Sequence, residues 1–129
     1  MPKAEGLTLP FESEENRRID LLETFPYEGE KQLITYETTE FSAVCPFSGL
    51  PDYGSLKITY IPKTQIVELK SLKYYITSFR NIGIYQEHVT NLIAKDLHPL
   101  LDPKYFKLET IYNTRGGIDT TCVIEKGEK

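Results

Sequence analysis

The chain has 129 residues, a formal net charge of −4 at pH 7 and a sequence pI of about 5.2. Its length fits one domain, and 40% hydrophobic with 26% charged residues excludes a disordered or collagen-like chain. The acidic charge disfavours extensive nucleic-acid binding, and no apolar run approaches the ~20 residues of a membrane span. Because the first residues lack the apolar stretch of a signal peptide, we expect a soluble cytoplasmic protein with reduced cysteines, without nucleic-acid or membrane partners.

The first half of the chain predicts an irregular arm followed by a hairpin. Prolines, glycine and a charged run occupy residues 1 to about 30, with a short helix expected near residues 19–23. Residues 31–44 are rich in β-branched and aromatic side chains and predict a strand. The prolines and glycines of residues 45–54 predict a loop, and residues 55–61 alternate as a second strand.

The second half predicts two helices and a second hairpin. Apolar side chains recur every three or four residues over 72–79 and again over 85–97, where Pro99 is expected to end the helix. Strands are expected at 105–112 and 118–124 around a turn at 113–117, with residues 125–129 fraying. This order predicts a single α+β domain over residues 1–129, with an antiparallel four-stranded sheet and two helices on one face.

The expected sheet has two open edges, and the chain is short for an enzyme with a deep cleft. Edge-to-edge pairing with other subunits, closing a barrel, would protect those edges. Nine tyrosines are typical of a domain with amphipathic contact surfaces. We therefore expect a homo-oligomer whose sites are shared between subunits.

Cys45 and Asp52 are the candidate catalytic pair. Cys45 opens the loop and Asp52 follows in it, so a carboxyl group can approach the thiol. Such a pair suits addition of sulfur to a carbon–nitrogen multiple bond, because the nitrogen must gain a proton from a nearby acid. The structural alternatives are a small buried thiol and a turn residue.

Two basic segments are candidates for binding phosphate. Lys70, Ser71 and Lys73 stand at a predicted helix start, where an anion is favoured; the alternative is that Ser71 caps the helix and the lysines are solvated. Arg115, followed by Gly116 and Gly117, permits close approach of an anion but also suits an ordinary hairpin turn. Neither segment is a GxGxxG motif, so a dinucleotide would bind outside a Rossmann unit.

Three further residue types have both structural and functional interpretations. Glu87, in the first turn of the second helix, fits the helix dipole and could also accept two hydrogen bonds from a guanine-like edge. His88 and His98 are isolated and more typical of surface or structural positions. Cys122, in the last strand, is expected to be a core thiol.

Taken together, these segments resemble a known enzyme family. The residues are Cys45-Pro-Phe-Ser-Gly-Leu-Pro-Asp52, Glu68-Leu-Lys-Ser-Leu-Lys-Tyr-Tyr75, Arg80-Asn81, Glu87 and Arg115-Gly-Gly117. In this order they resemble the short, single-module NADPH-dependent 7-cyano-7-deazaguanine reductases, nitrile reductases of the queuosine pathway of tRNA modification. The segment from Glu68 to Tyr75 is similar to the family's signature for NADPH use.

The resemblance implies a tunnelling fold that assembles into barrels as facing pentamers, with active sites at subunit interfaces. It implies that Cys45 adds to the nitrile as a thioimide and Asp52 protonates its nitrogen, with NADPH reducing the adduct to the aminomethyl product. Glu87 and Glu68 would bind the deazaguanine. Gln86 stands where the family usually has His; glutamine cannot titrate, so a role in positioning substrate is implied rather than proton transfer.

Two other functions on the same fold are alternatives. One is a zinc-dependent pterin cyclohydrolase-like enzyme using Cys45, His88 and Cys122, although their spacing matches no compact ligand motif. The other is a non-catalytic purine-binding or oligomerisation module. We expect no metal, because that spacing supports no zinc site. The non-catalytic module ranks last, because it would leave Cys45, Asp52 and the Lys70–Lys73 segment as coincidence.

Overall fold

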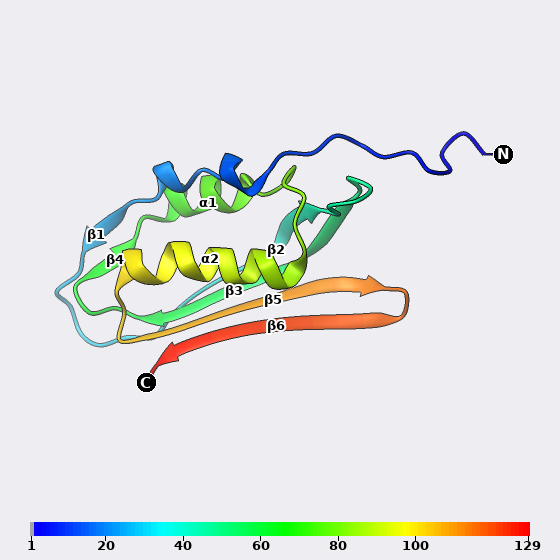
Figure 1. Ribbon diagram of the computed structural model, residues 1–129. Helices are drawn as coiled ribbons and strands as arrows, with labels where there is room; N and C mark the ends of the chain where they lie inside the picture. The colour runs from blue at the N-terminus through cyan, green and yellow to red at the C-terminus, as the bar shows by residue number, and fades with distance from the viewer. Residues whose placement is uncertain (1) are drawn as a thin grey trace.

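A computed structural model describes residues 2–129, and Figure 1 shows two helices lying across one face of an antiparallel sheet. The sheet has the strand order β2-β3-β5-β6. Its strands are β2 (Ile34–Val44), β3 (Pro51–Ile61), β5 (Tyr105–Arg115) and β6 (Ile118–Gly127). The helices are α1 (Leu69–Thr77) and α2 (Gln86–Leu101), and a small second sheet pairs β1 (Thr24–Pro26) with β4 (Gln65–Val67). The predicted α+β architecture with two helices on one face is confirmed.

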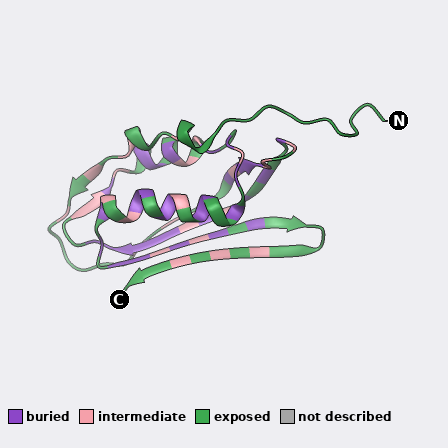
Figure 2. Cartoon of the chain, viewed as in Figure 1, coloured by how far each residue is buried: buried purple, intermediate pink, exposed green. Residues whose placement is uncertain are grey.

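The core lies between the sheet and the helices, as the purple segments of Figure 2 show. Leu56, Ile58 and Tyr60 alternate along β3 and are fully buried, which is the period of two that a half-covered strand requires. From α1, Leu72 and Tyr75 meet them at helical spacing. Neither α1 nor α2 combines the length and hydrophobicity of a bilayer-spanning helix, and the described residues contain no other α-helix.

Several element boundaries differ from the sequence prediction. Strand β3 begins at Pro51, so Asp52 lies in a strand and not in the loop. Helix α2 continues through Pro99 to Leu101, because a proline in the last turn removes only one helical hydrogen bond. Asp102, in the left-handed conformation, ends it. Strand β6 reaches Gly127, paired with β5, so most of the expected frayed tail is ordered.

The N-terminal arm is irregular as predicted, but it is fixed to the body of the protein. It contains two 3-10 helices, η1 (Glu14–Asn16) and η2 (Ile19–Leu21), the second at the position of the expected short helix. Arg17 donates two hydrogen bonds to the buried carboxylate of Asp96 on α2. Nearer the N-terminus, the Leu9 N–H donates to the Ser48 carbonyl at 2.7 Å. The arm therefore contacts both a helix and the loop that follows β2.

Candidate active site

The loop between β2 and β3 presents Cys45 within a tight turn. The Cys45 N–H donates to the Leu50 carbonyl at 2.8 Å, and the Gly49 N–H donates to the Cys45 carbonyl at 2.9 Å. Hydrogen bonds from the backbone N–H groups of Ser48 and Phe47, and from the Ser48 side chain, lower the pKa of the Cys45 thiol. These donors stabilise the thiolate, which is the nucleophilic form of cysteine.

The N-terminal arm packs against this turn at Gly49. Gly49 has φ of +74°, and a Cβ there would lie 2.3 Å from the Leu9 carbonyl oxygen. Glycine therefore meets two requirements at once, a left-handed backbone and close approach of another segment. The arm and the loop fit together only with glycine at this position.

Asp52 lies at the start of β3, at the same end of the sheet as Cys45. It pairs with Ala43 across β2 and β3, and its side chain is buried. Its negative charge is among the influences on Cys45, where it opposes the lowering of the thiol pKa. Asp52 accepts a hydrogen bond from Arg115, which comes from the end of β5. The structure thus brings a thiol, a carboxyl group and a guanidinium group together at one end of the sheet.

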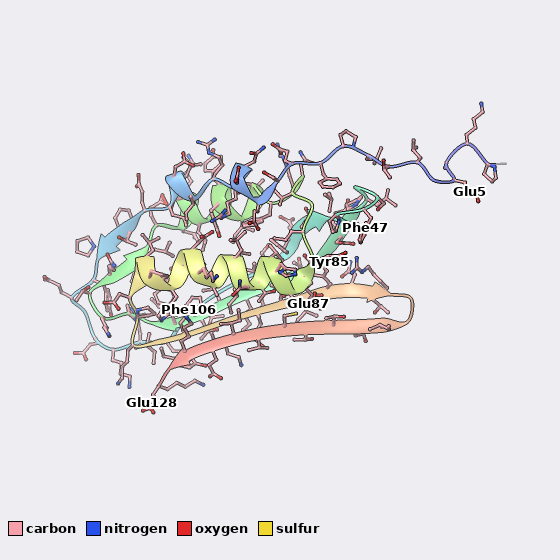
Figure 3. The ribbon with its side chains drawn as sticks, viewed as in Figure 1. Glu5, Phe47, Tyr85, Glu87, Phe106 and Glu128 are labelled. Carbon is pink, nitrogen blue, oxygen red and sulfur yellow. The ribbon has the colours of Figure 1, made fainter. Side chains whose placement is uncertain are left out.

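The start of α2 lies next to this loop. The Val44 N–H donates to the Ile82 carbonyl at 3.0 Å, and the Ile84 N–H donates to the Val44 carbonyl at 3.1 Å. Figure 3 shows the labelled side chains of Phe47 and Tyr85 near each other; their ring centroids are 6.0 Å apart in an edge-to-face arrangement. These two exposed rings offer an apolar surface at the loop that carries Cys45.

Glu87 and Gln86 are adjacent in sequence but have different surroundings. Glu87 is exposed in the first turn of α2, free to accept hydrogen bonds from a ligand. Gln86 is buried, and its amide nitrogen donates to the carbonyls of Thr110 and Thr120 at 3.1 and 3.0 Å. That nitrogen joins α2 to β5 and β6, so only the amide oxygen of Gln86 is available for the predicted role toward substrate.

The second group of predicted residues lies far from Cys45. Glu68 is the N-cap of α1 and accepts from the Ser71 N–H at 2.7 Å, so the expectation that Ser71 caps the helix is wrong. The Ser71 hydroxyl is also occupied, donating to the Glu68 carbonyl and accepting from the Glu23 N–H. Cys45 lies before the first residue of β3, whereas Glu68 lies after β4, beyond the last residue of β3. An 11-residue strand such as β3 spans roughly 33 Å, so the two residues are about one strand length apart. Figure 1 shows these two regions at opposite ends of the sheet.

Lys70 and Lys73 are exposed on α1, with no ion pair to any described residue. Lys73 lines a groove of about 540 Å³ between α1 and β2, whose wall includes Leu69, Leu72 and Ile76. The unpaired ammonium group of Lys73 beside this largely apolar groove suits a dinucleotide, which combines phosphates with planar rings. Glu37 and Glu40, on the opposite wall, are the acidic members of the lining.

Arg115, Gly116 and Gly117 form the β5–β6 turn, where both glycines are exposed. The Arg115 guanidinium lies 5.8 Å from the centre of the Tyr112 ring in addition to its contact with Asp52. A small cavity of about 190 Å³ lies between this turn and Gln86. The three residues therefore belong to the Cys45 end of the protein and are distant from the lysines of α1.

Sequence reasoning did not identify every group at the site. It did not give Ser48 a role at the thiol or Tyr85 a place beside it, although both stand in segments it singled out. It also did not predict the ion pair of Arg115 with Asp52, since their separation of 63 residues carries no local signal. Cys122 is only half-buried. Within the described residues, no three His, Cys, Asp or Glu side chains gather where a metal could bind, so Cys45, His88 and Cys122 form no such site.

The fold and this site define a tunnelling-fold protein with a candidate cysteine nucleophile at the end of its sheet. The family model described as QueF-like protein matches residues 51–129. The chain is 54% identical over 122 residues to the NADPH-dependent 7-cyano-7-deazaguanine reductase of Thermotoga petrophila, covering 94% of this chain and 89% of that protein. The chain belongs to the QueF-like protein family.

Further comparisons agree with this assignment. The reductase of the same name from Caldicellulosiruptor bescii is 51% identical over 106 residues, which are 81% of each chain. Among solved structures, the archaeosine synthase QueF-Like in its apo form matches with a TM-score of 0.68 at 23% identity. That match covers 75% of this chain and 95% of the other, and it confirms the fold.

Proposed function

We propose that this chain catalyses the NADPH-dependent reduction of the nitrile of 7-cyano-7-deazaguanine to the aminomethyl group, in queuosine biosynthesis. The observation that carries the proposal is the Cys45 turn, where donors that lower the pKa of the thiol lie beside the buried carboxyl group of Asp52. The high identity to reductases of this name supports the same reaction here.

In the first step, the Cys45 sulfur attacks the nitrile carbon. A carbon–sulfur bond forms, one π bond of the nitrile breaks, and the nitrogen takes a proton from the Asp52 carboxyl group, which gives a thioimide. No redox change accompanies this step. It converts a nitrile, which is a poor hydride acceptor, into a more electrophilic carbon, so one difficult reaction becomes several easier ones.

Reduction then requires four electrons in all. When bound, NADPH supplies the hydride that reduces the thioimide carbon and, from a second equivalent, the hydride that reduces the imine left after the Cys45 thiol departs. Asp52 is placed to donate protons to the same nitrogen. The Phe47 ring, two residues from Cys45 in the same turn, and the Tyr85 ring that packs on it would exclude water that could hydrolyse the thioimide.

The binding groups divide between the two ends of the chain. Glu87, with the amide oxygen of Gln86, would hold the deazaguanine near Cys45, whereas Glu68, Lys70 and Lys73 lie about one strand length away. We infer that a second copy of the chain brings its α1 to the Cys45 end, so that the lysines hold the cofactor phosphates there. This arrangement requires a homo-oligomer, for which facing pentamers are the predicted form.

Intact-mass spectrometry without NADPH tests the proposal. With 7-cyano-7-deazaguanine, the wild-type chain is expected to gain the mass of one whole substrate molecule, because the thioimide forms by addition. Cys45→Ala is expected to gain nothing. Cys122→Ala is the matched control, since it removes the other thiol and should still form the adduct. An adduct that persists in Cys45→Ala would refute the role of Cys45.

A further inference from the structure

We propose that Arg115 is a positioning residue for Asp52, holding its carboxyl group in the orientation needed for proton transfer at Cys45 during formation of the thioimide. The inference rests on the proposed function. In it, the Arg115 guanidinium holds Asp52, the proton donor, in place before NADPH binds, in addition to any contact with a phosphate of NADPH.

The geometry around Asp52 supports this assignment. The Nη1 atom of Arg115 donates to Oδ1 of Asp52, whose side chain is only 9% exposed. The Arg115 guanidinium is itself seated over the ring of Tyr112, at 5.8 Å from its centre. A buried carboxyl group with a charged partner in a fixed place has few alternative orientations.

A local irregularity of the strand pair accompanies this contact. Side chains three residues apart on a regular strand point to opposite faces, and Tyr112 is buried under the helices. The pairing of β5 with β6 shifts its register between Tyr112 and Arg115. The Arg115 guanidinium nevertheless reaches the Tyr112 ring and Asp52. A register shift of this kind is a β-bulge, which changes the direction of a side chain and is common beside active sites.

The hydrogen bonds of Asp52 leave one carboxyl oxygen available to take and give a proton. Oδ1 of Asp52 is occupied by Arg115, and Oδ2 makes no hydrogen bond to the described residues. The thiol proton of Cys45 passes to Oδ2, the thiolate attacks the nitrile carbon, and Oδ2 returns the proton to the nitrile nitrogen. The other titratable groups near this cluster are Tyr112 itself, Glu87 on α2 and Cys122 on β6.

The test measures the rate of adduct formation on Cys45 without NADPH, where a role in binding cofactor has no effect. Arg115→Ala is expected to slow this rate about 100-fold, the order expected for a misplaced catalytic group. Added guanidinium chloride at millimolar concentration should restore part of the rate, and Arg115→Lys should retain part of it. Arg18→Ala is the matched control, since it removes an arginine of an exposed ion pair and should react at the wild-type rate.

The outcomes separate this proposal from the proposed function. An Arg115→Ala protein that forms the adduct at the wild-type rate, and shows only a raised KM for NADPH, would overturn the positioning role. A slow rate that neither guanidinium nor lysine improves would also overturn it, because a structural defect explains such a loss. A wild-type protein that forms no adduct would refute the proposed function, and the role of Arg115 with it. The Arg115 side chain is 59% exposed, so circular dichroism of each variant should match the wild type.

Discussion

Replacing Asp96 by alanine is expected to destabilise the protein strongly, because this carboxylate joins three segments of the chain. It accepts from the Nε and Nη2 atoms of Arg17 in the N-terminal arm, at 2.7 and 3.1 Å. It also accepts from the hydroxyl of Tyr75 on α1. The Asp96 side chain is 5% exposed and Tyr75 is completely buried, so water cannot replace these contacts without opening the core.

The magnitude follows from what the substitution leaves behind. Removing one partner of a buried ion pair costs about 3–5 kcal/mol. Arg17 is 19% exposed and can recover part of its hydration, which favours the lower end of that range. The Tyr75 hydroxyl, left without an acceptor, adds about 1 kcal/mol or more. We therefore expect Asp96→Ala to lower the free energy of unfolding by about 4 kcal/mol, or the Tm by roughly 10 °C or more.

Thermal and urea unfolding followed by circular dichroism, at one fixed protein concentration, would measure this loss. The fixed concentration matters because self-association raises the apparent stability. Asp20→Ala is the matched control: it breaks the ion pair with Arg18, whose side chains are 63% and 54% exposed, and the Tm should not change measurably. A loss of less than about 1 kcal/mol for Asp96→Ala would contradict the reasoning, since the cluster would then be effectively solvated.

Three more substitutions or titrations follow from the structure. Gly49→Ala should lower stability by about 1–3 kcal/mol in urea unfolding, since it strains the backbone and contacts the Leu9 carbonyl; an unchanged midpoint would mean that the arm does not hold the loop. The pH profile of iodoacetamide alkylation should give Cys45 a pKa below the ordinary thiol value, and Ser48→Ala should raise it; equal profiles would exclude the Ser48 hydrogen bond. Burial lowers the pKa of His98, so the unfolded chain binds its proton more readily. Stability should therefore fall as the pH drops below ~6.5, and the fall should be smaller in His98→Gln; parallel curves would exclude this contribution.

The order of the main strands and helices could be predicted from sequence because apolar side chains repeat every two residues along the strands and every three or four residues along the helices. Alternation along 31–44 and 55–61, and the three-and-four spacing over 72–79, gave the order of the main elements. Short segments were missed: β1 and β4 have three residues each and are stabilised by pairing with one another, not by their own pattern. Such pairs become visible only when the chain is folded.

The start of β3 shows how one residue type can have two meanings. Gly54 belongs to a run of prolines and glycines that predicted a loop, yet it lies in the strand opposite Tyr112 and Phe41. A Cβ at Gly54 would come within 2.5 Å of the Ile111 carbonyl oxygen, so glycine is required there by close packing. Sequence alone does not distinguish a glycine required by a turn from a glycine required because a neighbouring strand packs too closely for a Cβ atom.

The candidate site was predictable as a set of residues but not as an arrangement. Cys45 and Asp52 were placed together because they are close in sequence. The ion pair of Asp52 with Arg115 connects β3 with the end of β5, and no spacing rule reaches across that distance. The separation of Glu68 from Cys45 depends on the length and direction of β3, which only the assembled sheet shows.

The central claim is that this chain reduces a nitrile through Cys45. Its most direct test follows NADPH absorbance with 7-cyano-7-deazaguanine and purified protein, together with quantitation of the amine formed. Because the nitrile needs four electrons and each hydride carries two, the account predicts two NADPH oxidised per amine by the wild-type protein and none by Cys45→Ala. No NADPH oxidation by correctly folded wild-type protein, or undiminished oxidation by Cys45→Ala, would contradict it.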